Sequence, residues 1–144
     1  MNVRGIEASA QVSRGPWLFR LGASYSHARV EARGAAANLD GLRPAQTPSL
    51  VLAGELGWSD RGRAVSLTVR RVGEQFEDDL NTQRMRPATT LDAFGAWPLT
   101  SRLQLVARGE NLLDETVIAT LGSDGTIERA TPRTLWIGFR LTGF

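Results

Sequence analysis

Apolar and polar residues alternate one by one in seven separate segments of this 144-residue chain. In the first segment, for example, apolar Ile6 and Ala8 flank polar Glu7. Side chains of a β-strand point alternately to its two faces, so this period of two predicts strands. The segments cover residues 4–12, 17–26, 50–58, 64–70, 90–97, 103–108 and 134–142. No stretch shows helical periodicity, so we predict an all-β, antiparallel, up-and-down fold.

The connections between these segments alternate in length. Short turns fall at residues 13–16, 59–63 and 98–102, and long polar segments fall at about 30–47, 74–88 and 112–132. Tight turns at one end and long loops at the other are typical of outer-membrane β-barrels. No apolar run approaches the roughly 20 residues of a transmembrane helix, and residues 1–7 do not resemble a signal peptide. We therefore predict a transmembrane β-barrel segment.

Composition excludes several classes of function. All 17 basic residues are arginine, cysteine is absent, and His27 is the single histidine. These counts exclude a phosphate-loop lysine, a thiolate nucleophile and a cysteine or histidine-rich metal site. Acidic residues lie between the arginines, so no nucleic-acid-binding patch forms. We expect no enzyme activity, no catalytic residues, no cofactor, no metal and no nucleic-acid partner.

Three tryptophans fall at the same end of their predicted strands. Trp17 directly follows a short turn, while Trp58 and Trp97 directly precede one, and all three have the parity of the apolar face. Tyr25 shares this parity and lies eight residues beyond Trp17, which spans about 20 Å in a strand tilted by roughly 40°. Because aromatic residues gather at membrane interfaces, we predict that these four side chains form an interfacial girdle.

Two further groups of polar residues are candidate functional sites. The long segment 74–88 carries an acidic cluster, which we interpret as a ligand-contacting outer loop. Its members are Glu74, Gln75, Glu77, Asp78, Asp79 and Asn81. The other group has the parity of the polar strand face, which lines the lumen in a barrel. It comprises Arg20, Glu55, Arg70, Asp92, Arg108 and Arg140. We expect opposite charges to pair across neighbouring strands there, such as Arg70 with Asp92.

An ordered series of motifs resembles the C-terminal portion of TonB-dependent outer-membrane receptors. The most specific is Asn-Leu-Leu-Asp at residues 111–114, which follows an alternating segment. The others lie at residues 4–7, 24–28, 41–48, 89–92 and 131–134, so the resemblance covers essentially the whole chain. One departure is the even-numbered terminal Phe144, which Gly143 offsets from the odd-numbered apolar residues of the last segment.

The resemblance implies about seven strands of a 22-stranded barrel, in which residues 1–144 form the C-terminal part. It implies uptake of a scarce nutrient such as a ferric siderophore or cobalamin. The implied partners are outer-membrane lipid, the missing plug, the remaining barrel strands and the TonB system. The implied location is the Gram-negative outer membrane, crossed by several strands, with the C-terminus in the periplasm. We expect the chain to be a receptor fragment that lacks the plug and the signal peptide.

Two alternatives remain open at this point. One is a small autonomous outer-membrane barrel that acts as a pore or adhesin. The other is a soluble all-β binding module with its apolar faces packed inward.

Overall fold

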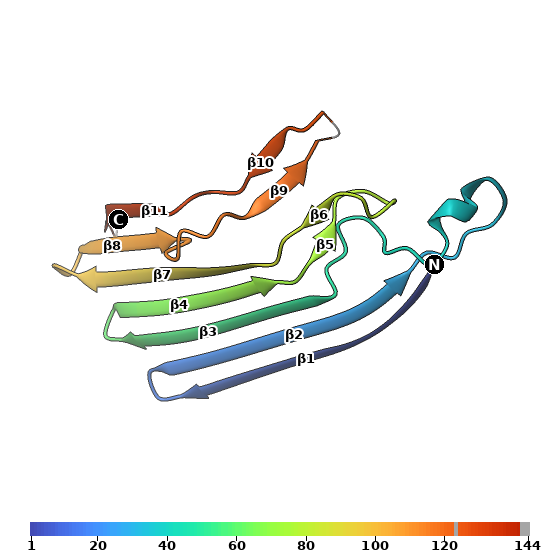
Figure 1. The fold of residues 1–144 in the computed structure, drawn as a ribbon. Helices are drawn as coiled ribbons and strands as arrows, with labels where there is room; N and C mark the ends of the chain where they lie inside the picture. Colours follow the sequence, from blue (N-terminus) through green and yellow to red (C-terminus); the bar gives the residue numbers. More distant parts are fainter. Residues whose placement is uncertain (123, 142–144) are drawn as a thin grey trace.

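Seven long strands form one antiparallel sheet in the computed structural model, which describes residues 1–122 and 124–141 (Figure 1). The strands are β1 (Asn2–Arg14), β2 (Trp17–Arg29), β3 (Leu50–Asp60), β4 (Arg63–Val72), β7 (Ala88–Pro98), β8 (Leu103–Glu110) and β11 (Thr134–Leu141). Their order in the sheet, β1-β2-β3-β4-β7-β8-β11, follows the chain. The predicted all-β, up-and-down fold is thus confirmed, and each predicted segment corresponds to one strand. The expected register offset at Gly143 and Phe144 lies outside the described residues.

The long connections contain short elements of their own. Residues 30–49 include the 3-10 helix η1 (Gly34–Leu39), which has no buried residues. The next two long connections each fold into a small hairpin, β5 (Gln75–Phe76) with β6 (Arg84–Met85) and β9 (Ile118–Leu121) with β10 (Ile127–Arg129). All three long connections lie at one end of the sheet and the short turns at the other (Figure 1). Among the described residues, no helix has the length and apolarity needed to cross a membrane.

Backbone conformation explains the two tightest turns. Gly15 has φ 55° at the first central position of the turn between β1 and β2, where Arg14 pairs with Trp17. The turn between β3 and β4 places both Arg61 and Gly62 at positive φ, 47° and 79°. Two-residue hairpins of these kinds match the right-handed twist of their strands, which fixes the register of each pair.

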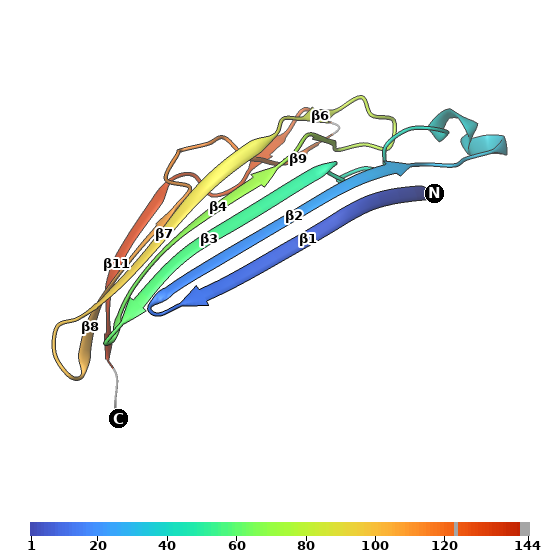
Figure 2. The ribbon, with the colours of Figure 1, turned by 90° about the horizontal axis from the view of Figure 1, so that it is seen from below.

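In the part of the chain that the structure describes, no second layer packs against the apolar face of the sheet. Among the described residues, the buried hydrophobic side chains are Ala28, Met85 and Ala96 alone. By contrast, Ile6 is 74% exposed and Ile137 is 78% exposed. A water-soluble sheet buries one face against another element, so this arrangement does not fit the alternative of a module with apolar faces packed inward. The sheet is also curved along its length (Figure 2).

Candidate ligand cleft

All six predicted lumen-facing charges lie on the polar face of the sheet, opposite the exposed apolar side chains. They come from β2, β3, β4, β7, β8 and β11. Arg20 and Glu55 are register partners on β2 and β3, and their charged groups pair at 2.9 Å. Arg20 Nε also donates to Gln11 Oε1 on β1 at 3.0 Å. Cross-strand charge pairing, as predicted, therefore occurs at this position.

The predicted pair between Arg70 and Asp92 is wrong. Arg70 lies opposite Thr90 and Asp92 lies opposite Thr68, so the two charges are offset by two residues along the sheet. Asp92 Oδ1 instead accepts the backbone N–H of Asn111 at 2.8 Å. No carboxylate of the described residues forms an ion pair with Arg70. The alternation of polar and apolar residues predicts the shared face of Arg70 and Asp92 but not the register between their strands.

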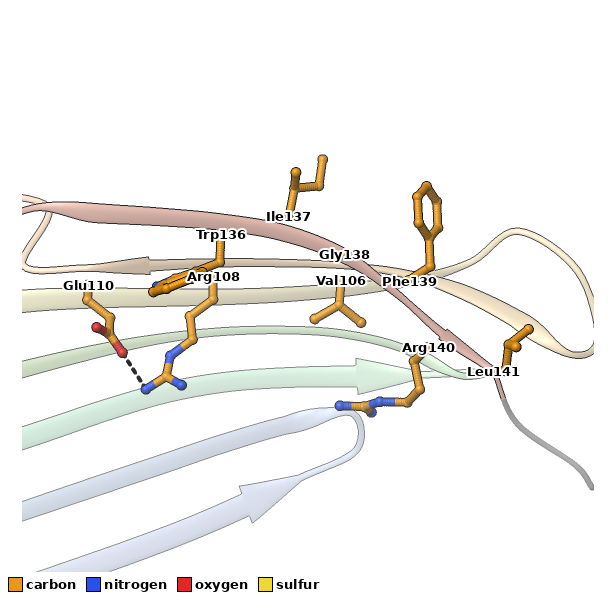
Figure 3. A pocket seen from close by; sticks show the side chains of 9 residues that line it. All are labelled: Val106, Arg108, Glu110, Trp136, Ile137, Gly138, Phe139, Arg140 and Leu141. Carbon is orange, nitrogen blue, oxygen red and sulfur yellow. Dashed lines mark ion pairs between the residues drawn. The ribbon is translucent and has the colours of Figure 1, made fainter.

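Arg108 and Arg140 lie near the β11 edge of the polar face. They line a cavity of about 690 Å³ together with Glu110 and Trp136. Arg108 Nη2 pairs with Glu110 Oε1 at 2.6 Å. Figure 3 shows these four side chains on one side of the sheet and Ile137, Phe139 and Leu141 on the other. The fourth tryptophan thus lies on the opposite face from the other three.

A second cavity, of about 590 Å³, lies where the polar face meets the long connections. Arg70 and Asp92 line it from the strands, and Gln75 and Arg86 line it from the segment between β4 and β7. The segment between β8 and β11 supplies further lining residues. These are Val117, Ile118, Ala119, Ala130 and Thr131. The cleft therefore combines charges of the sheet with polar and apolar groups of the loops.

The predicted acidic loop mainly binds the neighbouring loop of the same chain. Asn81 accepts the Arg43 N–H at 2.9 Å and donates to the Arg43 carbonyl at 2.8 Å. Asp79 accepts the Ala45 N–H at 3.3 Å, and Glu77 accepts from the Gln46 side-chain amide at 3.0 Å. These contacts join the first two long connections.

Glu74 and Asp78 also have partners within the chain. Glu74 forms ion pairs with Arg43 and Arg84. Asp78 accepts hydrogen bonds from the N–H groups of Thr82 and Gln83 and from the Thr82 hydroxyl. The Gln83 N–H makes the largest contribution to the lowered pKa of Asp78, and Thr82 lowers it further, while desolvation, the second-largest contribution, acts in the opposite direction.

Of the six predicted loop residues, Gln75 alone lines the 590 Å³ cleft. The acidic side chains are committed to loop structure instead, and within the described residues no cluster of His, Asp and Glu could hold a metal ion. A ligand-contacting role for the six residues stays a prediction. Arg86 and Glu110, which also line the cleft, were missed, because neither belongs to a charge cluster or a sequence motif.

The Asn-Leu-Leu-Asp motif fixes the base of the last long connection. Asn111 is 4% exposed and has φ 49°. Its side chain donates to the carbonyls of Glu115 and Thr131 and accepts the Glu115 N–H. Asp114 accepts from the backbone and side chain of Arg133, next to β11. The motif therefore closes the segment between β8 and β11 at both ends, beside Asp92 and the cleft.

The three girdle tryptophans lie at the short-turn end of the sheet. Trp17 and Trp58 are register partners on β2 and β3. The Arg63 guanidinium, at the start of β4, lies 4.4 Å from the centre of the Trp97 ring. Tyr25 lies at the other end of β2, opposite Leu50. This placement agrees with an apolar band that has the three tryptophans at one edge and Tyr25 at the other, and its contact with membrane stays a prediction.

Comparison with known families accounts for this combination of a curved sheet, long connections at one end and an exposed apolar face. Residues 1–112 match the model of the TonB-dependent receptor-like β-barrel family. The chain belongs to this family. The TonB-dependent receptor family consists of outer-membrane β-barrels, so the resemblance seen in the motifs is confirmed. No curated protein matches the chain by sequence.

Solved structures of TonB-dependent receptors share the fold. The chain superposes on the ferric yersiniabactin uptake receptor FyuA from Yersinia pestis with a TM-score of 0.86 and 21% identity, covering 99% of this chain and 23% of that one. The siderophore receptor PiuA from Acinetobacter baumannii superposes with a TM-score of 0.81 and 14% identity, covering 96% of this chain and 21% of that one. The ferric preacinetobactin receptor BauA from the same organism superposes with a TM-score of 0.77 and 20% identity, covering 96% of this chain and 22% of that one. The chain thus spans under a quarter of the length of these receptors.

Proposed function

We propose that this chain is the C-terminal part of a TonB-dependent receptor barrel that imports a scarce nutrient across the Gram-negative outer membrane. The observation that carries the proposal is the two-faced sheet, which exposes Ile6, Phe139 and other apolar side chains on one face. In hydrocarbon such a face needs no protein partner, and backbone groups are satisfied by neighbouring strands of a closed barrel. The polar face, with its charges and cleft, would line the lumen.

The proposal assigns partners to the remaining surfaces. β1 and β11 form the two edges of the sheet, and a membrane barrel must pair both edges with further strands. The polar face would contact the plug, which in turn would couple uptake to the TonB system. Short turns and the C-terminus would face the periplasm, and the long connections would face outward. The chain would act in transport and not as an enzyme.

The ligand class that best fits the cleft is an anionic chelate such as a ferric siderophore. Arg70 and Arg86 line the cleft and supply guanidinium groups, which bind carboxylate or related oxygen anions through paired hydrogen bonds. The names of FyuA, PiuA and BauA, all receptors for ferric compounds or siderophores, support this choice over cobalamin.

The test begins with the native polypeptide, detected with an antibody against residues 112–132. We expect a heat-modifiable band in the outer membrane, much larger than the 15.7 kDa of this chain. Energised cells should then take up a radiolabelled ferric siderophore, and Arg70→Gln should weaken uptake more than Arg102→Gln in an exposed short turn. A band near 15.7 kDa in the soluble fraction would overturn the receptor proposal.

A further inference from the structure

A shallow groove of about 540 Å³ crosses the apolar face of the sheet over β1, β2, β3 and β4. Small residues make this depression, because Ala8, Ala10, Ala23 and Gly54 fill little of the space between longer side chains. An added Cβ at Gly54 would come within 3.3 Å of Val69 and 3.4 Å of Leu21, so these two side chains closely flank the groove floor. The groove floor is therefore apolar and shaped by the backbone.

One charged side chain lies in the groove wall. Arg71, on β4, pairs in register with Leu52 and Thr89, and its guanidinium donates to the Thr89 hydroxyl at 2.9 Å. Arg71 is exposed, and no carboxylate of the described residues forms an ion pair with it. The hydroxyl contact orients the guanidinium without neutralising it.

The height of Arg71 on the sheet agrees with a membrane boundary. Arg71 lies eight residues after Arg63, which covers the Trp97 ring at the short-turn end. Tyr25 likewise lies eight residues after Trp17. Eight residues span about 20 Å in a tilted strand. In the register of the sheet Arg71 is level with Leu52 and Ala23, two residues short of Tyr25, so it lies near the far edge of the apolar band.

Charge on the apolar face is almost entirely positive and confined to the strand ends. The charged strand residues of that parity are Arg4, Arg14, Arg29, Asp60, Arg63 and Arg71. All but Asp60 are arginine, whereas the polar face mixes both signs. An arginine at the membrane surface attracts anionic lipid headgroups, and a guanidinium binds phosphate through paired hydrogen bonds.

We propose that this groove holds one acyl chain of a phosphate-bearing membrane lipid, with the lipid phosphate bound by Arg71. The proposal rests on the membrane-embedded barrel proposed above. The acyl chain would lie over the small residues of the groove, and the phosphate would meet the guanidinium that Thr89 orients. A bound lipid would thus cover a specific depression of the barrel wall, in addition to the bulk lipid around it.

The test uses the native polypeptide extracted from membranes in nonionic detergent and stripped of lipid. Native mass spectrometry would count bound phosphatidic acid and, separately, diacylglycerol with the same acyl chains. Arg71→Gln removes the charge, and Arg63→Gln is the control at the other end of the same strand and face. Ala23→Phe fills the groove, and Ala107→Phe makes the same change on an exposed position of that face outside the groove.

We expect phosphatidic acid to bind more tightly than diacylglycerol. Arg71→Gln should lower the affinity for phosphatidic acid about fivefold, which is the effect of one basic residue at an anionic surface. The same variant should leave the affinity for diacylglycerol unchanged. Ala23→Phe should lower the affinity for both lipids. Equal effects of each variant and its control would overturn the proposal and indicate adsorption over the whole face.

Failure of this inference is distinguishable from failure of the proposed function. A polypeptide found outside the membrane fraction would overturn the receptor assignment together with the lipid site. A membrane polypeptide whose variants and controls bind lipid alike would overturn the lipid site alone. Retention of heat-modifiable mobility in all four variants shows that any loss of binding does not come from unfolding.

Discussion

Asn81 holds the backbone of Arg43 through two reciprocal hydrogen bonds, although the two residues belong to different long connections. The side-chain carbonyl of Asn81 accepts the Arg43 N–H at 2.9 Å, and its amide donates to the Arg43 carbonyl at 2.8 Å. Asn81 itself has φ 58°, a conformation that asparagine tolerates better than most residues. The same amide also donates to the Asp78 carbonyl of its own turn at 3.3 Å, so one side chain connects this turn to the neighbouring loop.

Replacing Asn81 should separate the two loops. Asn81→Gly keeps the positive φ but removes both hydrogen bonds, so the local opening free energy should fall by about 1–2 kcal/mol. Hydrogen exchange of the Arg43, Ala45 and Gln46 amides should then quicken roughly tenfold, while exchange in the strands should not change. Asn2→Gly at the exposed start of β1 is the control. Unchanged exchange at Arg43, Ala45 and Gln46 would contradict a stabilising role for the two hydrogen bonds of Asn81.

Asp78 makes the turn at residues 78–83 dependent on pH. Its pKa is lowered from the ordinary value of 3.8, chiefly by the Gln83 N–H. A lowered folded pKa stabilises the turn above the unfolded pKa, and this contribution is lost as the pH falls through the folded value. Amide protection at Thr82 and Gln83 should therefore persist at about pH 5 and disappear below 3.8. Asp78→Asn should reduce this protection at neutral pH and abolish its pH dependence, and protection that disappears already at about pH 5 would contradict the assignment.

Asn111 should be the most sensitive residue of the Asn-Leu-Leu-Asp motif. Asn111→Asp keeps the shape but removes the donors to the carbonyls of Glu115 and Thr131 and places a charge at a site that is 4% exposed. We expect the free energy of unfolding to fall by about 2–3 kcal/mol. The measurement is the temperature at which the heat-modifiable band converts to its unfolded position, which should be lower in this variant. The same substitution at exposed Asn2 should have little effect. A similar temperature for both variants would show that the motif does not fix the loop base.

The two kinds of tryptophan should respond to different quenchers. In variants that retain one tryptophan, Trp17 should be quenched by lipids brominated near the headgroup, because it lies on the apolar face at the short-turn end. Trp136 lies on the polar face and should be quenched by aqueous iodide instead. Replacement of the other tryptophans by phenylalanine keeps an aromatic ring at each site. Iodide quenching of both to the same extent would contradict the assigned faces.

The sequence by itself determined the strands, their faces and the family. Alternation is a local property, so Ile6 and Glu7 were assigned to opposite faces without knowledge of any partner strand. The turn residues Gly15 and Gly62 mark two of the three short connections for an equally local reason, since both adopt positive φ. The motif at residues 111–114 was recognised from the sequence, although its hydrogen bonds were not.

Only the tertiary structure decided which polar groups meet. Register between strands places Arg70 opposite Thr90, two residues from the expected contact with Asp92. Docking of the long connections uses Glu77 and Asn81 within the chain, while the cleft gathers Arg86 and Glu110 from separate segments. These contacts join residues far apart in sequence, and their geometry depends on cross-strand register and loop packing. A period of two residues carries information about faces, but none about the partner that each side chain finds there.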